Sequence, residues 1–111
     1  MANPDILIYT DGSSRGNPGP GGYGIIMQKF TNKRSKEFYR GFRKTTNNRM
    51  ELLAVIEAIK KLTIKNLTVY IYTDSKYVVD AVEKKWVFNW EKKDFKGKKN
   101  SDLWKSFLGI Y

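Results

Sequence analysis

The sequence predicts an α/β fold in which helices flank a mixed sheet. Three runs rich in β-branched and aromatic residues, at positions 5–10, 22–30 and 37–42, are separated by turn-forming residues and predict antiparallel strands. A helical apolar period over residues 48–62 then precedes a fourth strand-like run that ends at Tyr72. A strand, a crossover helix and a further strand favour a parallel pair, made by the first and fourth strands or their neighbours.

The individual elements have local signals. Residues 5–10 are almost continuously apolar, as expected for a strand that is buried on both faces. Residues 11–22 contain Asp-Gly and Asn-Pro-Gly steps and are predicted to be a turn, and a second polar turn is expected around Asn32. A helix is expected to begin near Ser75, followed by a basic segment at 84–99 and the start of a last helix.

Length and composition limit the class of protein. The 111 residues suffice for one small domain, 1–111, and 41% of them are hydrophobic, which predicts a packed core. The chain has no cysteine and no histidine. Disulfides, thiolate metal sites and Ser-His nucleophiles are therefore excluded, and catalysis would have to use carboxylates. No basic leader and no run of 18 apolar residues is present, so we expect a soluble, cytoplasmic protein.

The charge of the chain favours a polyanionic partner. Lys and Arg number 21 against 11 Asp and Glu, a formal net charge of +10. Residues 84–99 hold seven lysines and two acids, Glu91 and Asp94, so this short segment carries a net +5. Aromatic rings beside cations suit contacts with nucleic-acid sugars and phosphates, although some of these rings could instead pack in a core. The interleaved aromatic residues are Trp86, Phe88, Trp90 and Phe95.

Two of the predicted strands end in the same dipeptide. Thr10-Asp11 follows the first run and Thr73-Asp74 follows the fourth. Ligands of open α/β sheets collect outside the carboxyl ends of parallel strands, where Asp11 and Asp74 would both lie. Each aspartate also has a purely structural interpretation: Asp11 could open an Asp-Gly turn, and Asp74 could cap the helix near Ser75.

A third carboxylate, Glu51, lies within the apolar arc of the helix predicted at 48–62 and should face the sheet. A buried carboxylate needs a cation, a hydrogen-bond partner or a proton. A capping box with Asn48 as N-cap is the competing explanation. The three acids together favour a metal site, and oxygen ligands alone indicate Mg²⁺ or Mn²⁺. Two such ions about 4 Å apart would hydrolyse a phosphodiester.

Nucleotide-binding loops are not supported. Residues 19–24 match G-x-G-x-x-G literally, but they contain a proline and lead into the apolar Ile25 and Ile26. A dinucleotide fingerprint must follow a strand and open a helix. The sequence also has no G-x-x-x-x-G-K-[ST] loop, so ATP use has no support.

Four segments, 9–13, 16–24, 45–52 and 73–78, together with Trp86, Trp90 and Trp104, resemble ribonuclease H type 1 of the bacterial type, which carries a basic protrusion. The resemblance spans essentially the whole chain. It implies a ribonuclease H-like mixed sheet, with three antiparallel N-terminal strands and a fourth strand parallel to the first. It also implies endonucleolytic cleavage of the RNA strand of RNA–DNA hybrids by two Mg²⁺ ions, with Mn²⁺ as a possible substitute, leaving 3′-hydroxyl and 5′-phosphate ends.

The same resemblance assigns residues to this activity. Three of the family's four metal-binding carboxylates match Asp11, Glu51 and Asp74, and Gly12 adjoins them. The loop that approaches RNA 2′-hydroxyls matches Gly12, Ser13, Ser14 and Asn17, some of which could serve only the turn. Contacts to the DNA strand match Thr46, Asn47 and Asn48, with Asn48 still open as a helix cap, and Lys76 replaces a commonly polar contact residue. Residues 84–99 resemble the family's basic protrusion. The residues expected to bind nucleic acid there are Lys84, Lys85, Trp86, Lys92, Lys93, Lys96, Lys98 and Lys99.

The sequence departs from the family after its fourth helix. The family continues into a fifth strand, a histidine-containing loop and a helix bearing the fourth carboxylate, whereas this sequence ends at Tyr111. We therefore expect a C-terminally incomplete domain with an uncovered sheet edge, open to self-association or to a complementing C-terminal segment. The alternative function is a catalytically impaired hybrid-binding fragment that needs this segment. A more distant alternative is that the chain is part of a larger polymerase- or transposase-like assembly.

Overall fold

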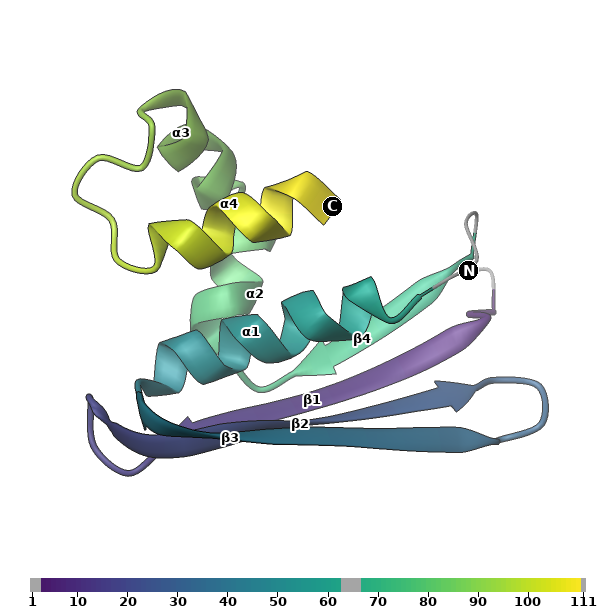
Figure 1. Ribbon diagram of the computed structural model, residues 1–111. Coiled ribbons are helices and arrows are strands. Elements are labelled where there is room, and N and C mark those ends of the chain that lie inside the picture. Colours follow the sequence, from purple (N-terminus) through teal and green to yellow (C-terminus); the bar gives the residue numbers. More distant parts are fainter. Residues whose placement is uncertain (1–2, 63–66, 111) are drawn as a thin grey trace.

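The computed structural model describes residues 3–62 and 67–110. A four-stranded sheet has the order β3-β2-β1-β4, with β1 antiparallel to β2, β2 antiparallel to β3, and β1 parallel to β4 (Figure 1). This topology confirms the predicted mixed α/β sheet. The elements are β1 Ile6–Ser14, β2 Gly19–Lys29, β3 Ser35–Thr45, α1 Asn47–Lys60, β4 Val69–Thr73, α2 Lys76–Glu83, α3 Trp86–Lys92 and α4 Ser101–Ile110.

The turn predicted at 11–22 is wrong in extent. β1 continues through Asp11 to Ser14, and β2 begins at Gly19. Asp11 pairs with Gly24 and Ser14 with Gly21, so Asp11 does not open an Asp-Gly turn. The pairing of β1 with β2 overrides the local turn preference of these glycines, because strand formation depends strongly on tertiary context. The polar turn expected around Asn32 is confirmed between β2 and β3.

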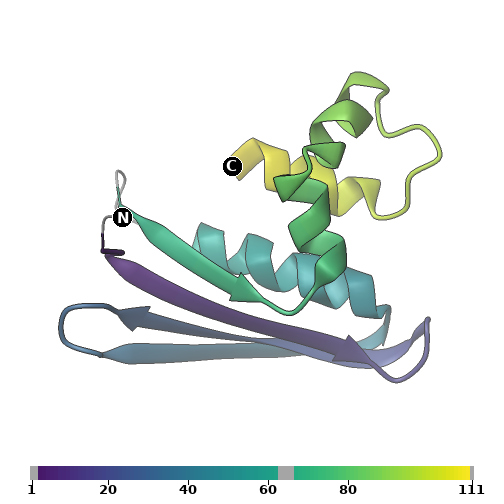
Figure 2. The same ribbon diagram turned by 180° about the vertical axis from the view of Figure 1, so that it is seen from behind.

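The helices lie on one side of the sheet, as the front and back views both show (Figures 1 and 2). α1 packs an apolar stripe on β1 and β2, and the buried residues of this first core are Ile8, Tyr23, Ile25, Met50, Ala54 and Ala58. On the strands, large side chains also remain exposed: Tyr9, Ile26, Tyr39 and Tyr72. The rings of Tyr9 and Tyr72 stack with centroids 5.2 Å apart. In the sheet of the described residues β4 is an edge strand, as predicted.

The start of α1 differs from the prediction. Thr46 is the N-cap, and its hydroxyl accepts a hydrogen bond from the Arg49 backbone N–H at 3.3 Å. Asn48 as N-cap is therefore wrong, because Asn48 already lies in the first turn of the helix. Threonine, like asparagine, caps helices well, so sequence preference alone did not separate the two positions.

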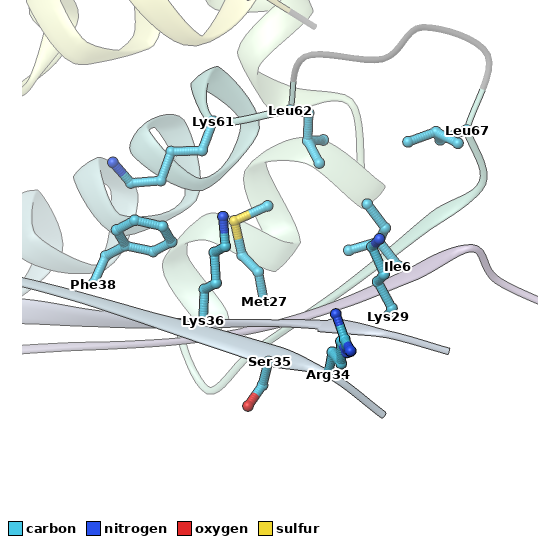
Figure 3. Close-up of a pocket in the computed structure, with 10 residues that line it drawn as sticks. All are labelled: Ile6, Met27, Lys29, Arg34, Ser35, Lys36, Phe38, Lys61, Leu62 and Leu67. Atoms are coloured by element: carbon cyan, nitrogen blue, oxygen red, sulfur yellow. The ribbon is translucent and has the colours of Figure 1, made fainter. Parts of the chain in front are cut away.

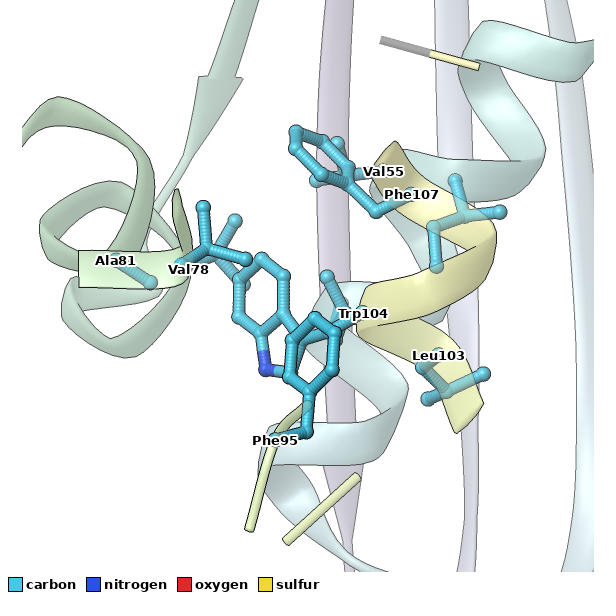
Figure 4. Close-up of a cluster of buried hydrophobic side chains, with 10 residues drawn as sticks. Val55, Val78, Ala81, Phe95, Leu103, Trp104 and Phe107 are labelled. Atoms are coloured by element: carbon cyan, nitrogen blue, oxygen red, sulfur yellow. The ribbon is translucent and has the colours of Figure 1, made fainter. Parts of the chain in front are cut away.

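A second core joins α1 to the three C-terminal helices. Trp104 of α4 is fully buried between Val78 of α2 and Phe95, which follows α3 (Figure 4). Trp90 packs edge-on against Trp104, with ring centroids 5.8 Å apart. The basic segment therefore contains a short helix, α3, that was not predicted. Three of its aromatic residues pack in or against this core: Phe88, Trp90 and Phe95.

α4 is also tied to the start of α1. The Arg49 guanidinium donates to both carboxylate oxygens of Asp102, at 3.0 and 2.8 Å, and to the Asn100 side-chain oxygen at 3.1 Å. The hydrogen bonds from Arg49 lower the pKa of the Asp102 carboxyl below its ordinary value. Both side chains are partly exposed, so the pair contributes little stability and mainly fixes the position of α4. None of the described helices has the length and hydropathy needed to cross a membrane.

The hydroxyl of Tyr77 supports the second core. It accepts hydrogen bonds from Trp104 Nε1 at 2.7 Å and from Asn100 Nδ2 at 3.3 Å. Tyr77→Phe would leave the buried indole N–H without this acceptor, which costs about 1–3 kcal/mol. We expect urea denaturation to show this decrease in the free energy of unfolding. Tyr39→Phe, on a side chain that is 87% exposed, is the matched control and should leave the midpoint unchanged. Equal effects of the two variants would contradict the assigned role.

Candidate functional site

Two carboxylates lie at one end of the strands, which we call the carboxylate edge; it is distinct from the outer edge of the sheet along β4. β1 and β4 run parallel with Thr10 opposite Thr73, so the residues that follow, Asp11 and Asp74, lie at the same end. Both are exposed. The capping interpretation of Asp74 is wrong, because Ser75 is the N-cap of α2 and its hydroxyl accepts from the Val78 N–H at 3.1 Å.

Glu51 reaches the same edge from α1 and bridges the two strands. Its Oε1 accepts a hydrogen bond from the Gly12 backbone N–H of β1 at 3.2 Å. Its Oε2 accepts from the Thr73 hydroxyl of β4 at 3.4 Å. The prediction that Glu51 faces the sheet is confirmed, and the capping-box alternative is wrong because these oxygens contact the strands instead.

The electrostatics of Glu51 reflect its surroundings. Burial raises the pKa of its carboxyl, and the negative charges of Asp11 and Asp74 raise it further, while the hydrogen bonds from Gly12 and Thr73 act in the opposite direction. A partly desolvated carboxylate beside two others is stabilised by a cation. The three acids therefore form one electrostatic unit.

The donor chemistry of this unit fits a hard divalent cation, because every candidate side-chain ligand is a carboxylate oxygen. Among the described residues, however, no three acidic, His or Cys side chains already converge into a coordinating group. Hydrogen bonds to Gly12 and Thr73 engage the Glu51 oxygens. An ion would thus have to draw the exposed carboxylates of Asp11 and Asp74 towards Glu51.

Gly12 permits the close approach of α1 to β1. A Cβ atom added at Gly12 would lie 2.5 Å from the carbonyl carbon of Met50 and 2.7 Å from the backbone nitrogen of Glu51. Both neighbours are backbone atoms, so any side chain at this position would push the helix away. Glycine is thus the residue that allows the hydrogen bond between Gly12 and Glu51.

Beyond the carboxylates, a polar network joins the connection between β1 and β2 to the start of α1. Asn17 Oδ1 accepts from the Asn47 backbone N–H at 2.9 Å and from the Ser14 hydroxyl at 3.2 Å. Asn47 Oδ1 in turn accepts from the Ser14 backbone N–H at 2.6 Å. Residues that the sequence assigned to two different nucleic-acid strands therefore share one hydrogen-bonded surface. Ser13 and Asn48 are exposed, and Thr46 is the helix cap.

The basic segment, residues 84–99, divides its side chains between surface and core. Its seven lysines are all exposed. Trp86 is 43% exposed, and the Lys84 ammonium lies 5.2 Å from the centre of its ring. Trp90 and Phe95 pack inward. Of the aromatic residues that alternate with these lysines, Trp86 is therefore the one whose ring is exposed beside a cation. Lys76, at the start of α2, is also exposed.

Two residues at the site were missed by the sequence analysis. Thr73 donates to Glu51 and accepts from the Ser75 backbone N–H at 3.1 Å. Its place in the repeated Thr-Asp pattern could have indicated this role. Arg49 holds α4 beside the start of α1. No local signal identifies that contact, because its partner, Asp102, is far away in the sequence.

Comparisons with known proteins identify the family of the chain. The RNase H family model matches residues 3–109. A Ribonuclease H of Trichodesmium erythraeum is 49% identical over 96% of this chain and 69% of its own length. A Ribonuclease H of Sulfurovum sp. is 49% identical over 97% of this chain and 71% of its own length. The chain thus spans about two thirds of the length of these relatives.

Solved structures show the same fold. LC9-RNase H1, a type 1 RNase H with the type 2 active-site motif, superposes with a TM-score of 0.80 at 30% identity, over 99% of this chain and 59% of the other. LC11-RNase H1 in complex with an RNA/DNA hybrid superposes with a TM-score of 0.72 at 28% identity, over 95% of this chain and 72% of the other. The expected ribonuclease H-like fold is confirmed, and the chain belongs to the ribonuclease H family of endoribonucleases.

Proposed function

We propose that this chain hydrolyses the RNA strand of RNA–DNA hybrids at the edge formed by Asp11, Glu51 and Asp74, leaving 3′-hydroxyl and 5′-phosphate ends. The observation that carries the proposal is the position of Glu51, which bridges Gly12 within β1 and Thr73 at the end of β4, beside both aspartates. Membership of the ribonuclease H family supports the reaction class.

The three carboxylates would hold two Mg²⁺ ions, with Mn²⁺ as a substitute. When bound, such ions activate a water molecule and stabilise the leaving oxygen of a phosphodiester. Asp11 and Asp74 can turn towards the ions because they are exposed. The Gly12 N–H and the Thr73 hydroxyl hold the Glu51 carboxylate in place, as partners of a metal ligand commonly do.

The hybrid would contact two surfaces beside the carboxylates. The network of Ser14, Asn17 and Asn47 presents hydroxyl and amide groups that can recognise 2′-hydroxyls and minor-groove edges, the features that distinguish RNA from DNA. The basic segment would act as a protrusion that binds DNA phosphates, with Trp86 against the sugars. LC11-RNase H1, which shares this fold, has been captured with an RNA/DNA hybrid.

We also propose that residues 1–111 form a C-terminally incomplete domain whose outer β4 edge accepts a complementing segment. The relatives are longer than the matched region, the β4 edge has no neighbouring strand in the described sheet, and Tyr9 and Tyr72 expose a stacked apolar surface beside it. Exposed apolar patches next to an unpaired strand are sites for further polypeptide.

Cleavage of a labelled RNA–DNA hybrid tests the proposed reaction. We expect cleavage with Mg²⁺ or Mn²⁺ and none with chelator, and no cleavage of matched DNA or RNA duplexes. Asp11→Asn should lower the rate by more than about 100-fold, because loss of groups that only support metal ligands already costs about 10- to 100-fold. Glu83→Gln, on an exposed carboxylate of α2, is the matched control. Binding without cleavage in either metal would instead identify a hybrid-binding fragment.

Salt dependence tests the basic segment. Lys92→Ala should weaken hybrid binding similarly for all sequences, and should reduce the slope of log K against log salt by about 0.9 if one phosphate contact is lost. The measurement is a titration of a labelled hybrid at several NaCl concentrations. Lys33→Ala, in the turn between β2 and β3, is the control and should keep the original slope. An unchanged slope for Lys92→Ala would exclude that lysine from the phosphate contacts.

The complementing segment can be supplied as a separate polypeptide, using the C-terminal third of the Trichodesmium erythraeum relative. We expect it to raise the melting temperature of the 111-residue chain, by burial of apolar surface. A Tyr9→Ser/Tyr72→Ser variant should lose most of this increase, whereas Tyr39→Ser should lose less because Tyr39 is not part of the stacked pair. If sedimentation shows that the chain alone forms a dimer which the added polypeptide does not dissociate, a second copy occupies the edge instead.

A further inference from the structure

Arg15 is the only Lys or Arg within residues 1–28. It lies in the connection between β1 and β2, directly after the last residue of β1. A groove of about 680 Å³ lies at the opposite end of the sheet, between the start of β1 and the end of α1 (Figure 3). Its floor and its cationic rim are formed, respectively, by Ile6, Met27, Phe38, Leu62 and Leu67, and by Lys29, Arg34, Lys36 and Lys61. Arg15 is thus separate from these cations and lies beyond the carboxylate edge.

The backbone on both sides of Arg15 is held by hydrogen bonds. The Arg15 N–H donates to the Pro20 carbonyl oxygen at 2.7 Å, which extends the pairing of β1 with β2 by one residue beyond Ser14. The Ser14 hydroxyl donates to the Gly16 carbonyl oxygen at 2.6 Å. The Arg15 side chain is exposed, and in the part of the chain that the structure describes no hydrogen bond or ion pair engages it. Its guanidinium is therefore available to a ligand, on a backbone that is fixed.

Arg15 continues a row of outward side chains along β1. Asp11 and Ser13 are exposed, whereas Gly12 between them is buried against α1. Alternate residues of a strand share one face, so Arg15 follows Ser13 on the face of Asp11. Each step of two residues spans about 6.8 Å, which places the Arg15 backbone about 14 Å from that of Asp11.

Two adjoining hollows connect these side chains. The first, of about 380 Å³, is lined in part by Asp11, Ser13 and Gly22. The second, of about 330 Å³, is lined in part by Ser13, Gly22 and Arg15. Gly24, which also lines the first hollow, has no neighbour within 4 Å of the place where a Cβ atom would stand. A hollowed path therefore leads from the Asp11 carboxylate to Arg15 along the outer face of β1.

This path suits the strand that is cut. The RNA strand has to pass over Asp11 in the proposed reaction, so it is the strand that the path can carry onwards to Arg15. Successive phosphates of one strand are about 3.4 Å apart along a duplex axis, so 14 Å corresponds to about four nucleotides. Carboxylates repel the phosphates near the scissile bond, and a guanidinium beyond them offers paired N–H donors that match a phosphate.

We propose that Arg15 binds a phosphate of the RNA strand, within about four nucleotides of the bond that is cut. The contact holds the RNA strand on the outer face of β1, while the network of Ser14, Asn17 and Asn47 approaches its sugars from the side of α1. Arg15 reaches no reacting atom, so it contributes affinity and the register of the RNA strand rather than bond cleavage. The inference rests on the proposed hydrolysis of RNA–DNA hybrids.

Titration of a labelled RNA–DNA hybrid at several NaCl concentrations, with chelator to prevent cleavage, tests the contact. Arg15→Gln should weaken binding by about 10-fold and reduce the slope of log K against log salt by about 0.9, because one phosphate contact is lost. Arg15→Lys keeps the charge and should retain the slope. Arg34→Gln is the matched control, because it makes the same change on an exposed arginine at the groove, and should change affinity by less than about two-fold.

The outcomes separate this inference from the proposed hydrolysis. If the unmodified chain binds the hybrid and Arg15→Gln has the affinity and slope of Arg34→Gln, the Arg15 contact is wrong and the hydrolysis is unaffected. If the chain binds the hybrid but does not cut it when Mg²⁺ is added, the hydrolysis is wrong, and the slopes still decide the contact. A chain that binds no hybrid would overturn both.

Neutral methylphosphonate linkages identify the strand that Arg15 contacts. The cut strand is made of DNA with a short central run of ribonucleotides, and single neutral linkages are placed up to about four nucleotides on either side of that run. At one position of this strand the neutral linkage should weaken binding by the unmodified protein about 10-fold, and should cause no further loss in Arg15→Gln. Such coupling in the complementary DNA strand instead, or at no position, would overturn the proposal.

The kinetics of the same variant distinguish binding from chemistry. With Mg²⁺ present, Arg15→Gln should raise KM by about 10-fold and leave kcat unchanged, because an interaction made equally in the ground state and the transition state is lost. Arg15→Lys should restore most of the KM. A fall in kcat at unchanged KM would contradict a role in holding the RNA strand.

Discussion

The close contact between α1 and β1 is the constraint on which the rest of the site depends. The Glu51 carboxylate reaches the Gly12 N–H only because Gly12 has no side chain to separate the helix backbone from the strand. This contact places a carboxylate of α1 where the pairing of β1 with β4 ends, at Thr10 and Thr73. Without it, Asp11 and Asp74 would be two exposed aspartates on neighbouring strands, and Glu51 would lose its hydrogen bond to Gly12.

Charge is distributed unevenly over this basic chain. The three clustered carboxylates occupy one end of the sheet, where burial and mutual repulsion raise the pKa of Glu51. Lysines gather in two other places, the basic segment at 84–99 and the groove between the sheet and the end of α1. The two basic surfaces differ in their apolar parts: the first exposes a single indole, Trp86, and the second surrounds an apolar floor.

The C-terminal helices carry the basic segment on a core of their own. Trp104 packs against residues from α1, α2 and the segment itself, and Tyr77 accepts its indole hydrogen bond. Trp90 and Phe95 anchor the segment in this core, which leaves its lysines on the surface. The contact of Arg49 with Asp102 then fixes α4 beside the start of α1, next to the polar network of Asn17 and Asn47.

The amino-acid sequence alone predicts the chain order of the four strands and of α1, α2 and α4, and it singles out Asp11, Glu51 and Asp74 as a group. Apolar periodicity and the repeated Thr-Asp endings are local patterns, which is why they can be recognised without the fold. Long-range contacts in the folded chain establish that β1 continues through Gly12 to Ser14, and that Thr46 rather than Asn48 caps α1. The same holds for the pairing of Asn17 with Asn47 and for the groove. These features depend on backbones and side chains that are distant in sequence, and local propensity contains no information about which distant partners will meet.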